Sequence, residues 1–184
     1  SVTSIGKEAF SSCVGIEGTL NISDTINEIQ NSAFSRCSGI TRINIGKGLT
    51  AINEKVFEYC TSLNSLSIPD WITYIGSYAF SYCSGIANTI TIPKSVTKID
   101  SFAFTFCTGF TNLKIENGLT EIGTYSFSYC SKLASFSIAE SVTTIKEGAF
   151  SYCTGIKGTL TIPNSIKSIE SHAFSYCSGF ENLK

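Results

Sequence analysis

Eight cysteines are the side chains of this sequence with the widest range of chemistry, and they are evenly spaced. Thiols form disulfides, bind zinc or act as nucleophiles. The interval between successive cysteines varies by no more than one position, and each cysteine ends a Phe-x-x-Cys motif. The eight motifs are Phe10/Cys13, Phe34/Cys37, Phe57/Cys60, Phe80/Cys83, Phe104/Cys107, Phe127/Cys130, Phe150/Cys153 and Phe174/Cys177.

The position of the cysteines favours packing over disulfide or metal chemistry. An even number of cysteines in a secreted protein is compatible with a disulfide framework. However, every cysteine holds the same place beside Phe, so stacked repeats would give their Cβ atoms parallel directions, which suit a disulfide poorly. A buried free cysteine packs as a small apolar side chain. We therefore expect eight reduced, inward-facing thiols.

Metal binding and catalysis find little support in the sequence. The only histidine is His172, which we expect to be exposed to solvent, and no Cys-x-x-Cys pair is present, so we predict no metal site. A catalytic nucleophile needs a base and an orienting group nearby, and nothing of this kind accompanies the many serines. No glycine-rich phosphate loop follows a strand pattern. We predict that the chain is not an enzyme and uses no cofactor.

The constant period indicates a solenoid of stacked, roughly 23/24-residue coils. In the unit from Cys60 to Cys83, Leu66-Ser67-Ile68 alternates apolar and polar residues, as a half-buried strand does. The same short parallel strand is expected at Leu20/Ile22, Ile43/Ile45, Ile90/Ile92, Leu113/Ile115, Phe136/Ile138 and Leu160/Ile162.

Two further elements are expected in each coil. Apolar pairs three positions apart predict a second short extended stretch, at Ile26/Ile29, Leu49/Ile52, Ile72/Ile75, Val96/Ile99, Leu119/Ile122, Val142/Ile145 and Ile166/Ile169. Ala79, Phe80 and Cys83 lie at i, i+1 and i+4, which is one face of a single helical turn. Each coil should thus hold a strand, an extended stretch and a helical turn.

Every third coil contains one extra residue, and it falls just before the strand. These insertions are at Glu17-Gly18-Thr19, Ala87-Asn88-Thr89 and Lys157-Gly158-Thr159. Gly and Asn accept left-handed backbone, so a bulge is expected at each. Duplication of a three-coil block would explain the spacing.

Composition and chain ends limit the class of protein. A net charge of −1 and a pI near 5.8 give no basic surface for nucleic acid. No apolar run is long enough to insert into a membrane. The chain begins and ends within a repeat and lacks Met. We expect residues 1–184 to be one array of about eight coils, cut from a longer array and lacking its caps.

The unit Cys-x-x-Leu-x-x-Leu-x-Ile-Pro-x-x-Ile-x-x-Ile-Gly-x-x-Ala-Phe-x-x-Cys resembles the BspA-type, or treponemal-type, leucine-rich repeat. The resemblance covers essentially the whole chain. It implies a leucine-rich-repeat solenoid, an extracellular or cell-surface location, and a role in adhesion through protein or glycan ligands of a host or matrix. It implies no catalytic residues.

The outward positions of the strands are the candidate ligand-binding residues, because a strand ribbon is the usual binding surface of such solenoids. Simple solvation of a strand face is the alternative interpretation, and only two coils carry the Thr-x-Thr pattern that would suit ice. Asn21 also begins the only N-glycosylation sequon. The two rows are Thr19, Arg42, Ser65, Thr89, Asn112, Ser135, Thr159, and Asn21, Asn44, Ser67, Thr91, Lys114, Ser137, Thr161.

Aromatic residues form a second candidate surface beside the Phe-x-x-Cys motif. They either stack between coils as a structural ladder or form a contact patch for a partner. The patch supports the main alternative function, a structural protein whose arrays associate side by side or end to end. Its central residues are Tyr78, Tyr82, Phe102, Phe106, Tyr125 and Tyr129.

Overall fold

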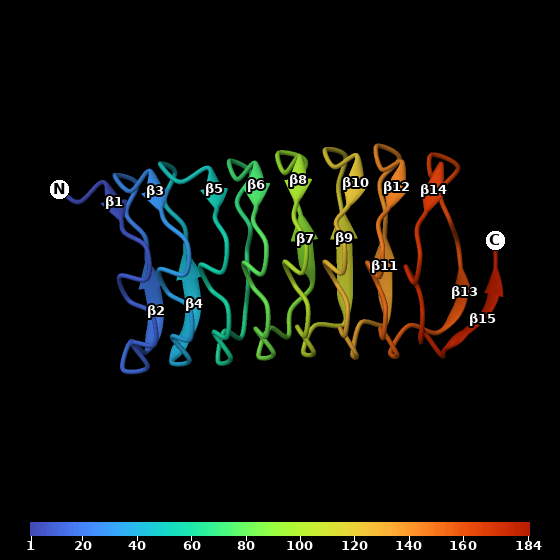
Figure 1. The fold of residues 1–184 in the computed structure, drawn as a ribbon, viewed down its shortest axis with the longest axis horizontal. Coiled ribbons are helices and arrows are strands. Elements are labelled where there is room, and N and C mark those ends of the chain that lie inside the picture. The colour runs from blue at the N-terminus through green and yellow to red at the C-terminus, as the bar shows by residue number, and fades with distance from the viewer.

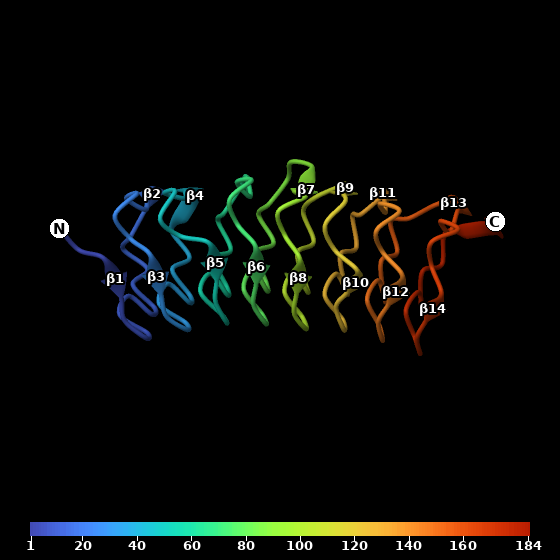
Figure 2. The same ribbon diagram turned by 90° about the horizontal axis from the view of Figure 1, so that it is seen from above.

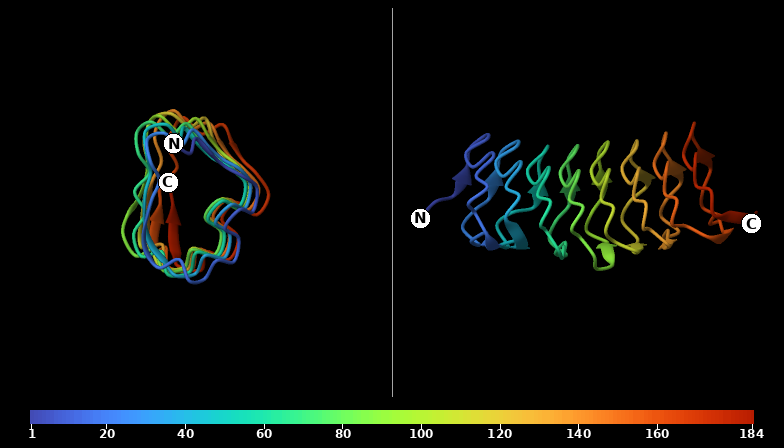
Figure 3. Two further views of the ribbon diagram at one scale, coloured as in Figure 1. Left: turned by 90° about the vertical axis from the view of Figure 1, so that its left-hand side faces the viewer. Right: turned by 90° about the horizontal axis from the view of Figure 1, so that it is seen from below.

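The computed structural model describes residues 1–184, which form one elongated solenoid with the two termini at opposite ends (Figure 1). Viewed end-on, successive coils superimpose around a common axis (Figure 3). A single coil cannot bury its apolar side chains alone, so neighbouring coils form the core together. One cluster of 46 buried residues runs through the array. The predicted solenoid is confirmed.

The first row of strands matches the predicted alternating segments. It consists of β2 (Gly18–Asn21), β4 (Ile40–Asn44), β7 (Ile90–Ile92), β9 (Asn112–Ile115), β11 (Ser135–Ser137), β13 (Gly158–Leu160) and β15 (Phe180–Leu183). Pairing is parallel. It joins β2 to β4, β9 to both β7 and β11, and β13 to β15. The segment Leu66–Ile68 has the strand pattern but forms no strand.

The second row of strands confirms the predicted extended stretch on another side of each coil (Figures 1 and 2). Each of these short strands lies one coil from the next: β1 (Ser4–Ile5), β3 (Glu28–Ile29), β5 (Ala51–Ile52), β6 (Tyr74–Ile75), β8 (Lys98–Ile99), β10 (Glu121–Ile122), β12 (Thr144–Ile145) and β14 (Ser168–Ile169). They form three parallel sheets, β1-β3, β5-β6-β8 and β10-β12-β14.

The predicted helical turn is wrong, because the Ala-Phe-x-x-Cys segment contains no helix. Its residues form consecutive tight turns in which Tyr78 and Tyr82 have φ angles of 57° and 60°. The amide of Ala79 donates to Gly76 three positions back, at 3.2 Å, whereas the amide of Phe80 donates to Ala103 in the next coil, at 2.8 Å. Left-handed residues interrupt a right-handed helix, and here alternate amides bond to a neighbouring coil instead.

The phenylalanines of the repeat form a stacked column through the core. Neighbouring rings from Phe10 to Phe174 have centroid distances between 5.2 and 5.8 Å. The rings from Phe34 to Phe150 are buried. This column explains why the aromatic residue recurs at the same place in each coil.

Seven of the eight cysteines are buried beside this column, as predicted, whereas Cys13, in the first coil, is exposed because the structure describes no coil before it. Each buried thiol donates to the carbonyl oxygen of the phenylalanine in the preceding coil, at 3.0 to 3.4 Å. Desolvation raises the pKa of Cys60, Cys107 and Cys177 to about 12. The thiols therefore stay protonated and donate their hydrogen bonds to backbone carbonyls of the preceding coil.

The rows of strands are interrupted at the three coils that carry an extra residue. In the first row the break lies before the long coil, and in the second row it lies after it. These long coils span positions 14–37, 84–107 and 154–177. In the first row, β7 and β13 pair with the following coil but not with the preceding one. In the second row, β3 and β8 pair with the preceding coil but not with the following one. The extra residue therefore tilts its coil toward one neighbour on one side and the other neighbour on the other side.

The expected bulge is confirmed at two of the three insertions. The parallel register shifts between Gly18 and Thr19 and between Gly158 and Thr159. The two glycines have φ angles of 76° and 77°, in the left-handed region that suits glycine. At the third insertion Asn88 has no positive φ, and its side chain has another role.

Candidate ligand-binding surface

The structure places all the predicted strand-face residues on the outer side of the first row. Twelve of the fourteen are exposed, and Ser65 and Thr91 are half-buried. They are exposed because side chains alternate between the two faces of a strand, and the intervening Ile and Leu residues fill the core. Whether these residues bind a ligand stays a prediction.

Several of these side chains bond to their neighbours along the row. The Asn44 amide donates to Asn21 Oδ1 at 2.6 Å, and Ser135 Oγ donates to Asn112 Oδ1 at 2.5 Å. Lys114 forms an ion pair with Glu116 at 2.8 Å, and its hydrogen bond lowers the pKa of that carboxyl. Such bonds hold short polar side chains in fixed orientations, which favours recognition.

Two clefts open on this face where the first row is interrupted. The larger has a volume of about 230 Å³ and is mostly polar; Arg42, Ile43, Asn44, Ser65, Leu66, Ser67 and Asn88 line it. The second, of about 200 Å³, is more apolar; Ala134, Ser135, Phe136, Ile156, Lys157, Thr159, Leu160, Thr161 and Phe180 line it. The structure thus gathers seven of the predicted residues around two concave sites.

Asn88 bonds to the backbone of Leu66, on the side of Leu66–Ile68 that faces β7. Its side-chain oxygen accepts from the amide of Leu66 at 3.1 Å, and its side-chain nitrogen donates to the carbonyl of Leu66 at 3.0 Å. One inserted side chain therefore replaces the backbone pairing expected with β7, and on the other side β4 does not pair with this segment either. Gly158, at the equivalent insertion, has no side chain for these bonds.

Sequence reasoning missed Asn88, Phe136 and Phe180 as cleft residues. Asn88 was recognisable as an insertion, and Phe136 stands where the other coils have Leu or Ile. Neither signal indicates a cleft by itself, because the cleft depends on how far two coils separate.

The aromatic residues form the stacked ladder that was one of the two alternatives. Tyr59, Tyr82, Phe106, Tyr129, Tyr152 and Tyr176 stack at centroid distances of 4.3 to 4.5 Å. Tyr78, Phe102 and Tyr125 form a shorter row, at 4.9 and 5.2 Å. Stacking covers the ring faces, so any partner of the inner rings would meet only edges and hydroxyls.

No arrangement for metal binding accompanies these surfaces. No group of three or more His, Cys, Asp or Glu residues is placed to hold a metal ion. His172 is exposed, as expected, and its Nδ1 lies 3.1 Å from Ser175 Oγ. The structure also has no helix with the length and apolar character needed to cross a membrane.

Stacked parallel strands, a near-constant repeat length and a continuous apolar core define a leucine-rich-repeat solenoid. The chain belongs to the family described as BspA type leucine rich repeat region, which matches in 6 copies over residues 1–90 and 52–181. No match exists among curated proteins.

Solved bacterial structures share the fold. A leucine-rich repeat protein from Bacteroides ovatus is 26% identical with a TM-score of 0.69, over 100% of this chain and 58% of that one. The leucine-rich repeat protein of T. pallidum is 25% identical with a TM-score of 0.77, over 90% of this chain and 74% of that one. A leucine-rich cell surface protein from Faecalibacterium prausnitzii shares the fold at 20% identity, with a TM-score of 0.56, over 99% of this chain and 63% of that one. The chain thus spans about 58% of the Bacteroides structure.

Proposed function

We propose that the chain is a non-catalytic recognition scaffold at a cell surface and that it binds protein or glycan ligands through the first row of strands. The observation that carries the proposal is the pair of clefts on this face, one polar and one more apolar, in which hydrogen bonds along the row hold Asn44 and Ser135. Concave sites with a few placed polar groups are the usual form of ligand pockets.

The cell-surface part of the proposal is supported by the family and by the printed description of the Faecalibacterium protein as a cell surface protein. The relatives named above are described as leucine-rich repeat proteins. Binding without turnover is the activity that fits such a scaffold.

The test measures binding of the chain to immobilised extracellular-matrix proteins and to a glycan array. Ser67→Arg would fill the polar cleft, and Thr161→Arg would fill the apolar one. We expect at least one of these variants to weaken binding about tenfold or more. Ser84→Arg is the matched control, because Ser84 is exposed and outside both clefts.

Three results would overturn the proposal. One is a ligand that Ser67→Arg and Thr161→Arg bind as tightly as the control Ser84→Arg does. Another is the absence of any ligand on the matrix proteins and the array. The third is concentration-dependent association of the chain with itself in sedimentation experiments, with no other partner, which would support the structural alternative.

A further inference from the structure

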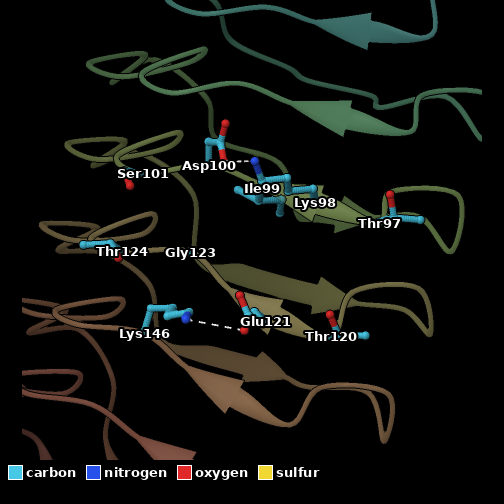
Figure 4. Close-up of a pocket in the computed structure, with 10 residues that line it drawn as sticks. All are labelled: Thr97, Lys98, Ile99, Asp100, Ser101, Thr120, Glu121, Gly123, Thr124 and Lys146. Atoms are coloured by element: carbon cyan, nitrogen blue, oxygen red, sulfur yellow. Dashed lines mark ion pairs between the residues drawn. The ribbon is translucent and has the colours of Figure 1, made fainter.

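The largest cleft lies on another side of the solenoid, in the second row of strands, and the proposed function does not use it. It has a volume of about 450 Å³ and opens between β8 and β10, where the long coil 84–107 turns away from the following coil. Figure 4 shows Lys98 and Asp100 on one coil, facing Glu121 and Lys146 across the cleft.

The interruption leaves backbone groups of the ladder without their usual partners. In the paired coils, the amide of Thr97 donates to the Thr73 carbonyl at 3.0 Å, and that of Thr143 donates to Thr120 at 2.9 Å. The hydroxyls of Thr97 and Thr143 donate to the same carbonyls, at 3.3 and 3.2 Å. Thr120 makes neither bond to Thr97. The amide and hydroxyl of Thr120 and the carbonyl of Thr97 are therefore left open to a ligand.

One further backbone amide without a partner lies at Gly123, further along the same cleft. The amides of Asp100 and Lys146 donate to Ile75 and Ile122 of their preceding coils, at 2.9 and 3.0 Å. Gly123 occupies the equivalent position but makes no such bond to Ile99. The cleft therefore presents open backbone groups near Thr120 and an unbonded amide at Gly123, whereas the Ile99 carbonyl packs directly against Gly123.

The charged side chains of the cleft cancel one another. Lys98 pairs with Asp100 at 2.9 Å, and Lys146 pairs with Glu121 at 3.4 Å. Lys146 also lies 3.5 Å from Glu170 in the next coil. Two paired cations and two paired anions favour neither an anionic nor a cationic ligand. Ile99 is the only hydrophobic residue of the lining, so the cleft does not suit an apolar ligand either.

An equivalent cleft lies three coils nearer the N-terminus, between β3 and β5. It has a volume of about 350 Å³ and is lined only by polar residues, Lys7, Glu28, Gln30, Asn31 and Asn53. There, Asn53 takes the position of Gly123, and its side-chain nitrogen donates to the Ile29 carbonyl at 2.8 Å. The Asn53 side chain thus bonds to the Ile29 carbonyl, whereas the equivalent Ile99 carbonyl packs against Gly123, which has no side chain.

We propose that the cleft between β8 and β10 binds a neutral saccharide of one or two sugar units. A saccharide carries many hydroxyls and no net charge, so it can donate to Asp100, Glu121 and the Thr97 carbonyl. It can also accept hydrogen bonds from Lys146 and the open amides of Thr120 and Gly123. A volume of about 450 Å³ is in the range of small-ligand sites.

The experiment titrates the ¹⁵N-labelled chain with cellohexaose, maltohexaose, mannohexaose and a galactan oligosaccharide, with a heparin oligosaccharide as the charged comparison. Amide chemical shifts report the site, because Thr120 and Gly123 have free amides there. We expect at least one neutral oligosaccharide to shift these two resonances, and to shift the first-row amides much less.

Thr120→Arg would fill the cleft and should weaken this binding about tenfold or more. Thr73→Arg is the matched control, since Thr73 is exposed in the same column but belongs to an unbroken ladder, and it should bind within about twofold of the unchanged chain. Thr120→Val retains the shape of Thr120 and removes only the hydroxyl, so it separates loss of a hydrogen bond from misfolding.

The proposal is overturned if the neutral oligosaccharides leave both resonances unchanged at millimolar concentration, or if only heparin moves them. It is also overturned if a folded Thr120→Arg variant binds as well as Thr73→Arg. Ser67→Arg and Thr161→Arg act on the other side of the solenoid, so a saccharide that binds here should bind these variants unchanged, and their results distinguish this site from the first-row clefts.

Discussion

The thiol of Cys83 donates a hydrogen bond to the carbonyl oxygen of Phe57, one coil nearer the N-terminus, at 3.1 Å. The ring of Phe57 stacks on Phe80, in the same motif as Cys83, with a centroid distance of 5.6 Å. One Phe-x-x-Cys motif therefore joins neighbouring coils twice, by ring stacking and by a bond from sulfur to backbone.

Removing a buried thiol should destabilise the array. We expect Cys83→Ala to lower the free energy of unfolding by about 1–2 kcal/mol, because it removes a hydrogen bond and leaves a small cavity. Urea denaturation followed by circular dichroism measures this loss. Cys13→Ala is the control, since Cys13 is exposed, and its effect should stay within about 0.5 kcal/mol. Equal losses in both variants would contradict the role assigned to the bond.

High pH should destabilise the fold through the same thiols. Burial raises the pKa of Cys60, Cys107 and Cys177 to about 12, whereas the unfolded thiols titrate near the ordinary value of 9.0. Between these values the unfolded chain binds fewer protons than the folded one, so stability falls as pH rises above about 9.

The slope of this decline identifies the thiols as its cause. Each fully buried thiol contributes about 1.4 kcal/mol per pH unit in that range. Urea denaturation at about pH 8 and about pH 10 measures the total, and Cys107→Ala should reduce the difference. A difference that does not change in Cys107→Ala would attribute the decline to other groups.

Breaking the outer aromatic row should cost stability even though its rings are partly exposed. Tyr129 stacks on Phe106 and on Tyr152, both at 4.3 Å. We expect Tyr129→Ser to lower the free energy of unfolding by about 1–3 kcal/mol, and Tyr129→Phe to retain most of it.

A combined variant separates the two interpretations of this row. Replacing Tyr82, Phe106 and Tyr129 together by Ser should prevent stable folding if the rings are a structural ladder. A folded triple variant that loses a binding partner would instead support the contact patch.

Close packing of coils should make one glycine position sensitive to a methyl group. A Cβ atom on Gly85 would lie 2.6 Å from the carbonyl oxygen of Thr61, whereas nothing lies within 4 Å of a Cβ on Gly15. We expect Gly85→Ala to lower the thermal midpoint clearly, with a loss of about 1–3 kcal/mol, and Gly15→Ala to have little effect. Similar midpoints for both variants would show that the coils separate more easily than their backbone positions indicate.

The sequence by itself determined the period, the inward cysteines and the two rows of extended segments. Leu66, Ile75, Phe80 and Cys83 recur in register because each coil must present the same apolar side chains to its neighbours. The repeated positions therefore identify the buried side chains, and the near-constant period is enough to predict them.

Only the tertiary structure decided the turn conformation and the clefts. Ala79, Phe80 and Cys83 fit a helical turn locally, but the Phe80 amide bonds to Ala103 in the next coil, and the neighbouring Tyr78 and Tyr82 have positive φ angles that a helix does not allow. Thr97 and Thr120 look equivalent in the sequence, yet the tilted long coil separates them and opens the largest cleft between them. Repetition specifies what each coil buries, whereas the angle between two coils depends on hydrogen bonds that form only once both are in place.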